Sequence, residues 1–231
     1  MATPPKPTRP RTTTPKRPPA TLVLFVRHAT TPSTGRVLPG RAPGLHLAES
    51  GQEQAARLAD RLAAWAPSNG SRPPIAAIYA SPLERTRETA APLARALGVR
   101  VQVARGLTEC DFGEWTGAEL KKLMKLPEWT TVQRYPSGFR FPGGESFSGM
   151  QARVVDAVAD LRRRHPGETI VAVSHADPIK AVVADALGTH LDLFQRIVIS
   201  PCSVTAIAYS PTGPAVLAVN STGSLSDLAV S

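Results

Sequence analysis

Two short segments of this chain carry residue types that can do phosphoryl chemistry. An apolar run of strand type over residues 22–26 is followed by Arg27 and His28. A second such run, over residues 169–174, is followed by His175. Because α/β proteins bind ligands at the carboxyl ends of their strands, we expect both imidazoles at one edge of a sheet. Two histidines and an arginine there suit a phosphoryl group, which a neutral imidazole can attack to form a phosphohistidine.

Arg85 is a candidate phosphate ligand. It follows the strand predicted at residues 75–80 and falls in the first turn of a helix, for which Ser81 is the predicted N-cap. Helix amino termini attract anions, and a guanidinium group can grip phosphate oxygens in a bidentate manner. Arg87 competes for this role but points elsewhere on the helix. The alternative for Arg85 is an exposed helix charge.

A carboxyl group is a candidate proton donor to the leaving oxygen of a phosphate ester. Glu109 lies in a stretch rich in acids and aromatic rings, over residues 107–115. On spacing alone Asp111 and Glu114 are its rivals, and the whole stretch can also be read as a solvated acidic loop.

The elements that must position these residues alternate between strand and helix. Strands are predicted over residues 22–26, 75–80, 99–103, 168–174, 203–209 and 215–220, and helices over residues 49–65, 81–97, 118–124 and 179–187, with a longer helix starting at residue 146. This alternation predicts an α/β fold, a three-layer sandwich with a largely parallel central sheet flanked by helices. Residues 105–145 form a less regular excursion.

Composition predicts one folded domain behind a tail. The chain has 231 residues, of which 42% are hydrophobic and 19% charged, as in soluble globular proteins. Residues 1–20 hold five basic side chains, no acid and seven prolines, so we expect a disordered basic tail. Residues 21–231 hold the remaining 22 basic and 18 acidic side chains, a net charge of +4 that suits an anionic substrate. They form the predicted catalytic domain.

Several function classes lack their residues here. The apolar runs are too short to span a membrane, and no signal-peptide core begins the chain, so a cytoplasmic location is expected. The histidines and the two cysteines show no metal-ligand spacing, so no metal is expected. Glycine-rich nucleotide-binding loops are absent. The basic tail has no interleaved aromatic residues, so a nucleic-acid partner is not favoured.

Five segments occur in order between about residues 21 and 220: RHA at 27–29 with Thr31, SPLERTRETA at 81–90, LTECDFGEWTG at 107–117, PGGES at 142–146 and SHA at 174–176. Together they resemble the motifs of the histidine phosphatase superfamily, also called the phosphoglycerate mutase-like family. The resemblance implies the fold of that family and a phosphohistidine mechanism that needs neither a metal nor an organic cofactor.

The resemblance also implies a role for each matching residue. His28 is then the nucleophile, Glu109 is the proton donor, and Arg27, Arg85 and His175 form the phosphate pocket. By the same analogy the substrate-binding residues are Arg27, Thr31, Thr34, Arg85 and Ala176.

The chain departs from the family pattern at several positions. Ala29 and Ala176 replace glycines, which we expect to tighten the pocket slightly. Thr34 stands where many members have an asparagine, and its hydroxyl can still donate a hydrogen bond. Ala48 replaces a threonine that often caps the following helix.

The activity expected from the resemblance is hydrolysis of a small phosphomonoester. The arginine and tyrosine that follow the acid in phosphoglycerate mutases are absent after Glu109, and little chain is available between Gly117 and Pro142 for a closed lid. A phosphatase must admit water to its phosphohistidine, whereas a mutase must exclude it. The alternatives are a phosphomutase and a non-catalytic module that binds phosphate ligands.

The substrate body is expected against residues 32–46 and 110–145. Four arginines in these loops are available for a second anionic group, and each can equally be a solvated surface charge: Arg36, Arg41, Arg134 and Arg140. The sequence names neither the physiological substrate nor the oligomeric state.

Overall fold

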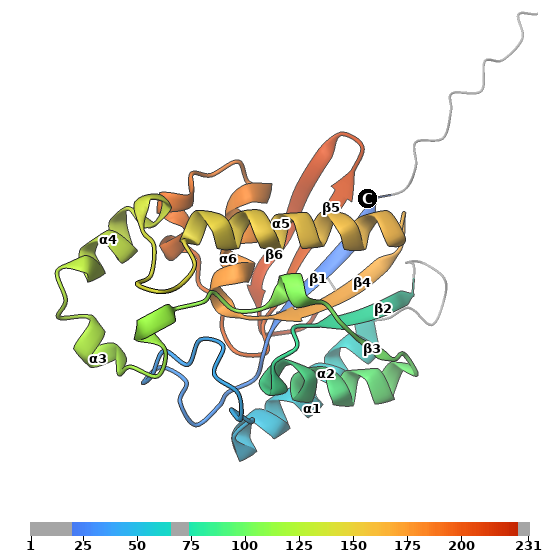
Figure 1. The fold of residues 1–231 in the computed structure, drawn as a ribbon. Coiled ribbons are helices and arrows are strands. Elements are labelled where there is room, and N and C mark those ends of the chain that lie inside the picture. The colour runs from blue at the N-terminus through green and yellow to red at the C-terminus, as the bar shows by residue number, and fades with distance from the viewer. Residues whose placement is uncertain (1–19, 66–73, 226–231) are drawn as a thin grey trace, which may run out of the picture.

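The computed structural model describes residues 20–65 and 74–225 (Figure 1). Except for Ala20, the predicted basic tail lies outside the described residues.

A six-stranded sheet forms the middle layer of the fold, with the strand order β3-β2-β4-β1-β5-β6. Neighbours among the first four strands in this order are parallel, whereas β1 pairs with β5 and β5 with β6 in antiparallel fashion. The predicted α/β class is confirmed, with the two closing strands forming an antiparallel hairpin. The strands are β1 (Thr21–Arg27), β2 (Ile75–Ala80), β3 (Val101–Val103), β4 (Thr169–Ser174), β5 (Val204–Ser210) and β6 (Gly213–Ser221).

Helices cover both faces of the sheet, as Figure 1 shows. The helices α1 (Glu49–Trp65) and α2 (Glu84–Leu97) pack on one face, and α5 (Phe147–Arg164) and α6 (Ala176–Ala186) pack on the other. Side chains of a strand point alternately to the two faces, so β1 sends Phe25 into one apolar cluster and Leu24 into the other. This two-sided burial explains why β1 and β4 are apolar between their polar end residues.

The excursion over residues 105–145 is folded on its own aromatic core. It contains short 3₁₀ turns and two short helices, α3 (Leu120–Leu123) and α4 (Glu128–Arg134), of which the sequence predicted only the first. Edge-to-face ring pairs hold it together, with Phe141 5.4 Å from Trp115 and 5.1 Å from Phe147 between ring centroids. The excursion lies at one end of the sheet (Figure 1).

The starts of two helices differ from the prediction. The helix α2 begins at Glu84 with Leu83 as its N-cap and no side-chain cap, so the predicted N-cap at Ser81 is wrong. The helix α6 begins at Ala176, three residues earlier than predicted. Pro178 sits in its first turn, where the missing N–H has no intrahelical partner to lose.

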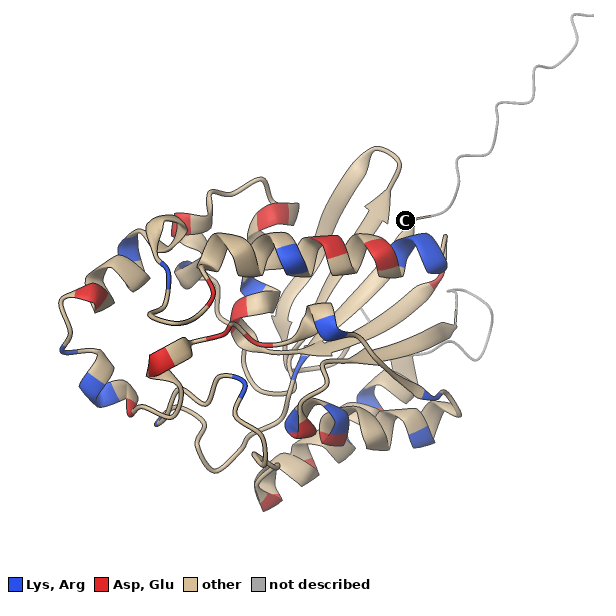
Figure 2. Cartoon of the chain, viewed as in Figure 1, with Lys and Arg blue, Asp and Glu red and all other residues tan. Residues whose placement is uncertain are grey.

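The predicted helix over residues 49–65 is confirmed as α1, and Gly98, with a φ of +66°, ends α2 as predicted. Acidic and basic side chains are interspersed along α5, which ends in three arginines (Figure 2). Within residues 20–65 and 74–225, no helix is long and apolar enough to cross a membrane.

Gly51 lets α1 approach the loop that follows β1. A Cβ at this buried position would lie 2.1 Å from the carbonyl oxygen of Thr30. We therefore expect Gly51→Ala to lower the free energy of unfolding by about 1–3 kcal/mol, although Gly→Ala inside a helix ordinarily stabilises. Urea unfolding measures the change, with exposed Gln52→Ala as the control. An unchanged or raised unfolding midpoint would contradict this packing.

Candidate active site

The pairing of β1 with β4 places the two predicted histidines side by side. Arg27 and Ser174 are partners in the parallel register, and the His28 N–H donates to the Ser174 carbonyl at 2.9 Å. The next residue of each strand is therefore a histidine, and the ring centroids of His28 and His175 lie 5.2 Å apart.

His28 is held as a neutral imidazole with one free lone pair. Its Nδ1 lies 2.7 Å from the carbonyl oxygen of Ala29, so Nδ1 carries the proton and donates, which leaves the lone pair on Nε2. Burial, together with the positive charge of Arg85, lowers the pKa of His28 to about 3. At neutral pH this side chain is an uncharged nitrogen nucleophile.

His175 is oriented by a residue that the sequence analysis assigned elsewhere. The hydroxyl of Ser81, which follows β2, lies 2.9 Å from His175 Nε2. Burial first, and then the charge of Arg85, lowers the pKa of His175 well below its usual value. If Ser81 donates to Nε2, the proton of the neutral ring is on Nδ1. Nδ1 is buried and has no hydrogen-bond partner within the described residues.

Arg85 is fully buried beside these rings. Its Nη2 donates to the carbonyl oxygen of Gly40 at 2.9 Å, but Nε and Nη1 have no partner. The pKa of Arg85 is lowered because burial removes its charge from water. Arg87, its rival in the sequence, is exposed on α2.

Arg27 completes a set of unsatisfied donors. Its Nη1 donates to the carbonyl oxygen of Ile199 at 2.7 Å, while its buried Nε has no partner. With Arg85 and His175, four buried nitrogens lack a hydrogen-bond acceptor within the described part of the chain. Buried donors are normally satisfied, and an anion with several acceptor oxygens matches this set.

Glu109 is the acid that the fold brings to the histidines. Its side chain is buried, and its Oε2 lies 4.0 Å from Nδ1 of His175. Burial, and then the charge of Asp177, raises its pKa to about 7. A carboxyl group with this pKa can hold a proton and release it near neutral pH.

The two rival acids lie in other surroundings. The carboxylate of Asp111 accepts from the Gly113 N–H and pairs with Arg41 at 3.5 Å, and Glu114 is exposed. Of the three acids, Glu109 alone is buried beside His175.

The backbone of Glu109 is clamped by two arginines. Its carbonyl oxygen accepts from Arg41 Nε at 2.8 Å and from Arg153 Nη2 at 3.3 Å. Both guanidinium groups also donate to Glu145 Oε2, at 2.9 Å each. Arg153 on α5 and Glu145 in the loop before it were not predicted as site residues, because no local pattern distinguishes a charged residue that supports another backbone from a surface charge. Asp177, whose charge acts on Glu109, was missed for the same reason.

The smaller predicted residues hold the loop after β1. The hydroxyl oxygens of Thr31 and Thr34 lie 3.0 Å apart, and the Thr31 N–H donates to the Thr34 hydroxyl at 2.9 Å. The Ala29 N–H donates to the Thr89 hydroxyl on α2, and Ala176 is the first residue of α6. These bonds shape the loop, and direct contacts of Thr31, Thr34 and Ala176 with substrate stay predictions.

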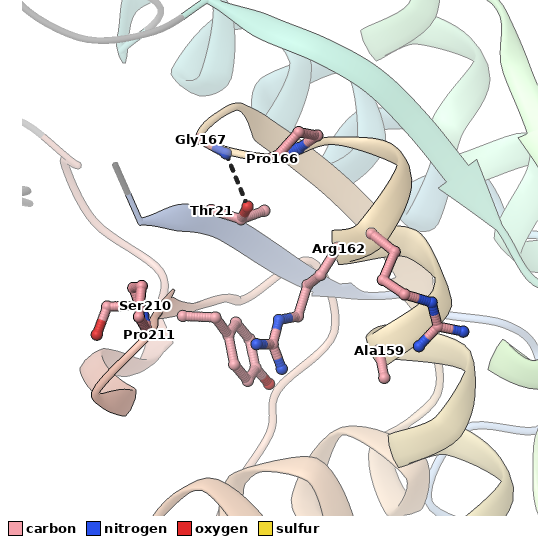
Figure 3. A pocket seen from close by; sticks show the side chains of 9 residues that line it. Thr21, Ala159, Arg162, Pro166, Gly167, Ser210 and Pro211 are labelled. Carbon is pink, nitrogen blue, oxygen red and sulfur yellow. Dashed lines mark hydrogen bonds between the residues drawn. The ribbon is translucent and has the colours of Figure 1, made fainter. Parts of the chain in front are cut away.

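A separate cavity of about 340 Å³ lies at the other end of the strands, beside the start of β1 (Figure 3). Thr21, at the start of β1, lines it, whereas the candidate site lies beyond the end of β1. The guanidinium of Arg162 lies 3.9 Å from the ring centroid of Tyr209 there. Within the described residues no group of three or more histidine, cysteine or acidic side chains is arranged to hold a metal ion.

Comparison with known proteins identifies the family. The sequence model of the Histidine phosphatase superfamily (branch 1) matches residues 23–222. Phosphoserine phosphatase 1 of Hydrogenobacter thermophilus is 33% identical over 196 residues, which cover 83% of this chain and 89% of that protein. A probable phosphoglycerate mutase of an Enterobacter species is 30% identical over 191 residues, 81% of this chain and 84% of that protein.

A longer relative and a solved structure also match. A bifunctional protein of Mycobacterium tuberculosis is 34% identical over 209 residues. The match covers 89% of this chain but only 55% of the length of that protein. A mycobacterial glucosyl-3-phosphoglycerate phosphatase has the same fold, with a TM-score of 0.76 and 23% identity. That match covers 88% of this chain and 100% of that one.

Arg85→Lys tests the anion pocket without any assumption about turnover. Lysine keeps the positive charge but loses the planar set of donors, of which Nε and Nη1 lack partners. Loss of one or two charged hydrogen bonds is expected to weaken binding of inorganic phosphate about 10- to 100-fold. Isothermal titration calorimetry measures this, with exposed Arg87→Lys as the matched control. Equal phosphate affinity in Arg85→Lys and wild type would rule out this pocket.

Proposed function

The chain belongs to the histidine phosphatase superfamily, and we propose that it hydrolyses small phosphomonoesters through a phosphohistidine at His28. The observation that carries the proposal is the neutral imidazole of His28, set beside four buried donor nitrogens that lack acceptors. A phosphoryl dianion supplies the acceptor oxygens that these donors need. The relatives named as phosphatases support the same activity.

In the first step the ester phosphate binds with its oxygens toward Arg27, Arg85 and His175. His28 Nε2 attacks phosphorus, and the bond from phosphorus to the ester oxygen breaks. The proton of Glu109 passes to the departing oxygen, so the product alcohol leaves uncharged. The protein then carries a phosphohistidine and an ionised Glu109.

In the second step the ionised Glu109 removes a proton from water. The water oxygen attacks phosphorus, and the phosphorus–nitrogen bond to His28 breaks. Inorganic phosphate leaves, while His28 is again neutral and Glu109 again protonated. A pKa near 7 suits a group that gives up a proton in one step and takes one in the next.

A phosphomutase is the second candidate, because a probable phosphoglycerate mutase is among the relatives. It would use the same side chains and return an isomer in place of free phosphate. A non-catalytic phosphate-binding module is less favoured, since the lone pair on His28 Nε2 would then have no use. We further propose that the reaction needs no metal and takes place in the cytoplasm.

Removal of the nucleophile is the direct test of the proposed hydrolysis. His28→Ala is expected to lower phosphate release by at least about 10³-fold while the protein stays folded, because no other residue supplies the attacking nitrogen. The measurement is phosphate release from a panel of phosphomonoesters in the presence of EDTA, with circular dichroism as the folding control.

Free phosphate that disappears in His28→Ala supports the hydrolase. Isomer formation without free phosphate supports the mutase instead, and full activity of His28→Ala would refute the mechanism. Loss of wild-type activity in EDTA would contradict metal independence.

Replacement of the acid separates its role from that of the pocket. With an alkyl phosphate, kcat/KM of the wild type is expected to fall as the pH rises above about 7, because Glu109 then loses the proton it must donate. Glu109→Gln should remove this limb and lower kcat/KM about 10²- to 10⁴-fold.

With 4-nitrophenyl phosphate the loss of kcat/KM in Glu109→Gln should be much smaller, since that leaving group departs without a proton. The exposed Glu114→Gln serves as the control. Equal losses of kcat/KM for the two esters would contradict the role of Glu109 as proton donor.

A further inference from the structure

A cleft of about 280 Å³ separates the excursion from α6 and the 3₁₀ turn at Leu191–Arg196. Leu120 and Trp129 of the excursion line one side of it, together with Phe112 and Phe141. On the other side lie Asp177 and Lys180 of α6.

Two residues that line this cleft, Asp177 and Phe112, lie next to residues of the candidate site. Asp177 follows His175 by two residues in the first turn of α6, and its charge acts on both Glu109 and Arg27. Phe112 lies close to Gly40, where a Cβ would be 3.2 Å from its ring. The carbonyl of Gly40 in turn accepts from Arg85. Two of the lining residues are thus linked to the groups around the phosphoryl site.

The apolar side of the cleft is rigid and rich in rings. Phe112 and Phe141 pack edge to face with their centroids 4.9 Å apart, and both are buried. Trp129 is stacked on Trp115 at 6.4 Å between ring centroids. Trp129 and Leu120 are only half-buried, so an apolar body, above all a ring, that packs against them removes apolar surface of both partners from water.

Two cations close to this cleft, Lys180 and Arg41, are already paired. Lys180 lies 3.2 Å from the Asp177 carboxylate and 3.1 Å from the amide oxygen of Gln195. Arg41 pairs with Asp111 and Glu145 and also donates to Glu109. A carboxylate on the alcohol part of the substrate would have to displace one of these partners, whereas a neutral ring would not.

Resting on the proposed phosphatase activity, we propose that this cleft receives the alcohol part of the substrate and selects neutral alcohols with an apolar ring. The substrate class is then a ring-bearing alkyl or aryl phosphomonoester, and not a small carboxylated phosphate such as phosphoserine. The Asp177–Lys180 ion pair lies beside the bound ring. It has no net charge and can form hydrogen bonds with the substrate.

A pair of primary alkyl esters tests this without a difference in leaving-group chemistry. We expect kcat/KM for 2-phenylethyl phosphate to exceed that for ethyl phosphate by at least about tenfold, from burial of the phenyl ring. It should exceed kcat/KM for phosphoserine and 3-phosphoglycerate by a similar factor. Trp129→Ala and Leu120→Ala should each lower the phenylethyl-to-ethyl ratio at least about threefold.

The phenylethyl-to-ethyl ratio of kcat/KM does not change when a variant is merely less well folded, because misfolding lowers both kcat/KM values together. Met124→Ala is the matched control, because Met124 is 60% exposed and follows α3 outside the cleft. Its ratio should equal that of the wild type.

A wild-type ratio near one, a preference for phosphoserine or 3-phosphoglycerate, or unchanged ratios in Trp129→Ala and Leu120→Ala would each overturn the specificity inference. The proposed hydrolysis would survive all of these outcomes. Release of no phosphate from any of these esters would overturn both proposals.

Discussion

The parallel pairing of β1 with β4 is the constraint on which the rest of the site depends. It sets Arg27 opposite Ser174, so that the residue after each strand is a histidine at the same edge of the sheet. A slip of one residue would turn one of the two strands over and send its histidine to the opposite face. The buried side chains on both faces oppose such a slip, because it would exchange the two apolar clusters.

Burial then sets the protonation states that the chemistry requires. Removal from water favours the uncharged form of any titratable group, so it lowers the pKa of His28 to about 3 and raises that of Glu109 to about 7. The first step needs a neutral nucleophile and a protonated acid, and one environment supplies both. The guanidinium groups cannot be neutralised in this way, so their unpartnered nitrogens favour a bound anion.

The excursion carries most of the cleft to which we assign the selection of the substrate. Its aromatic core holds the ring walls of the cleft, and Arg41 and Arg153 anchor the backbone of Glu109 in the same segment. Glu145 accepts hydrogen bonds from both arginines. One carboxylate therefore supports the position of Glu109 and that of the neighbouring cleft wall. The strand ends thus position Arg27, His28 and His175, whereas the excursion supplies both Glu109 and most of the cleft wall.

The amino-acid sequence predicts the fold class, most element positions and, with the family resemblance, the three residues that the structure places beside the two histidines: Arg27, Arg85 and Glu109. Alternation of apolar runs and helical periodicity are local signals, and both strand-end histidines can be read from them. Tertiary contacts make Ser81 orient His175 in place of capping α2, and they bury Arg85 while Arg87 stays exposed. They also bring Arg153 to the backbone of Glu109. These outcomes depend on contacts between segments distant in the chain, and no local pattern encodes which partners a polar side chain finds.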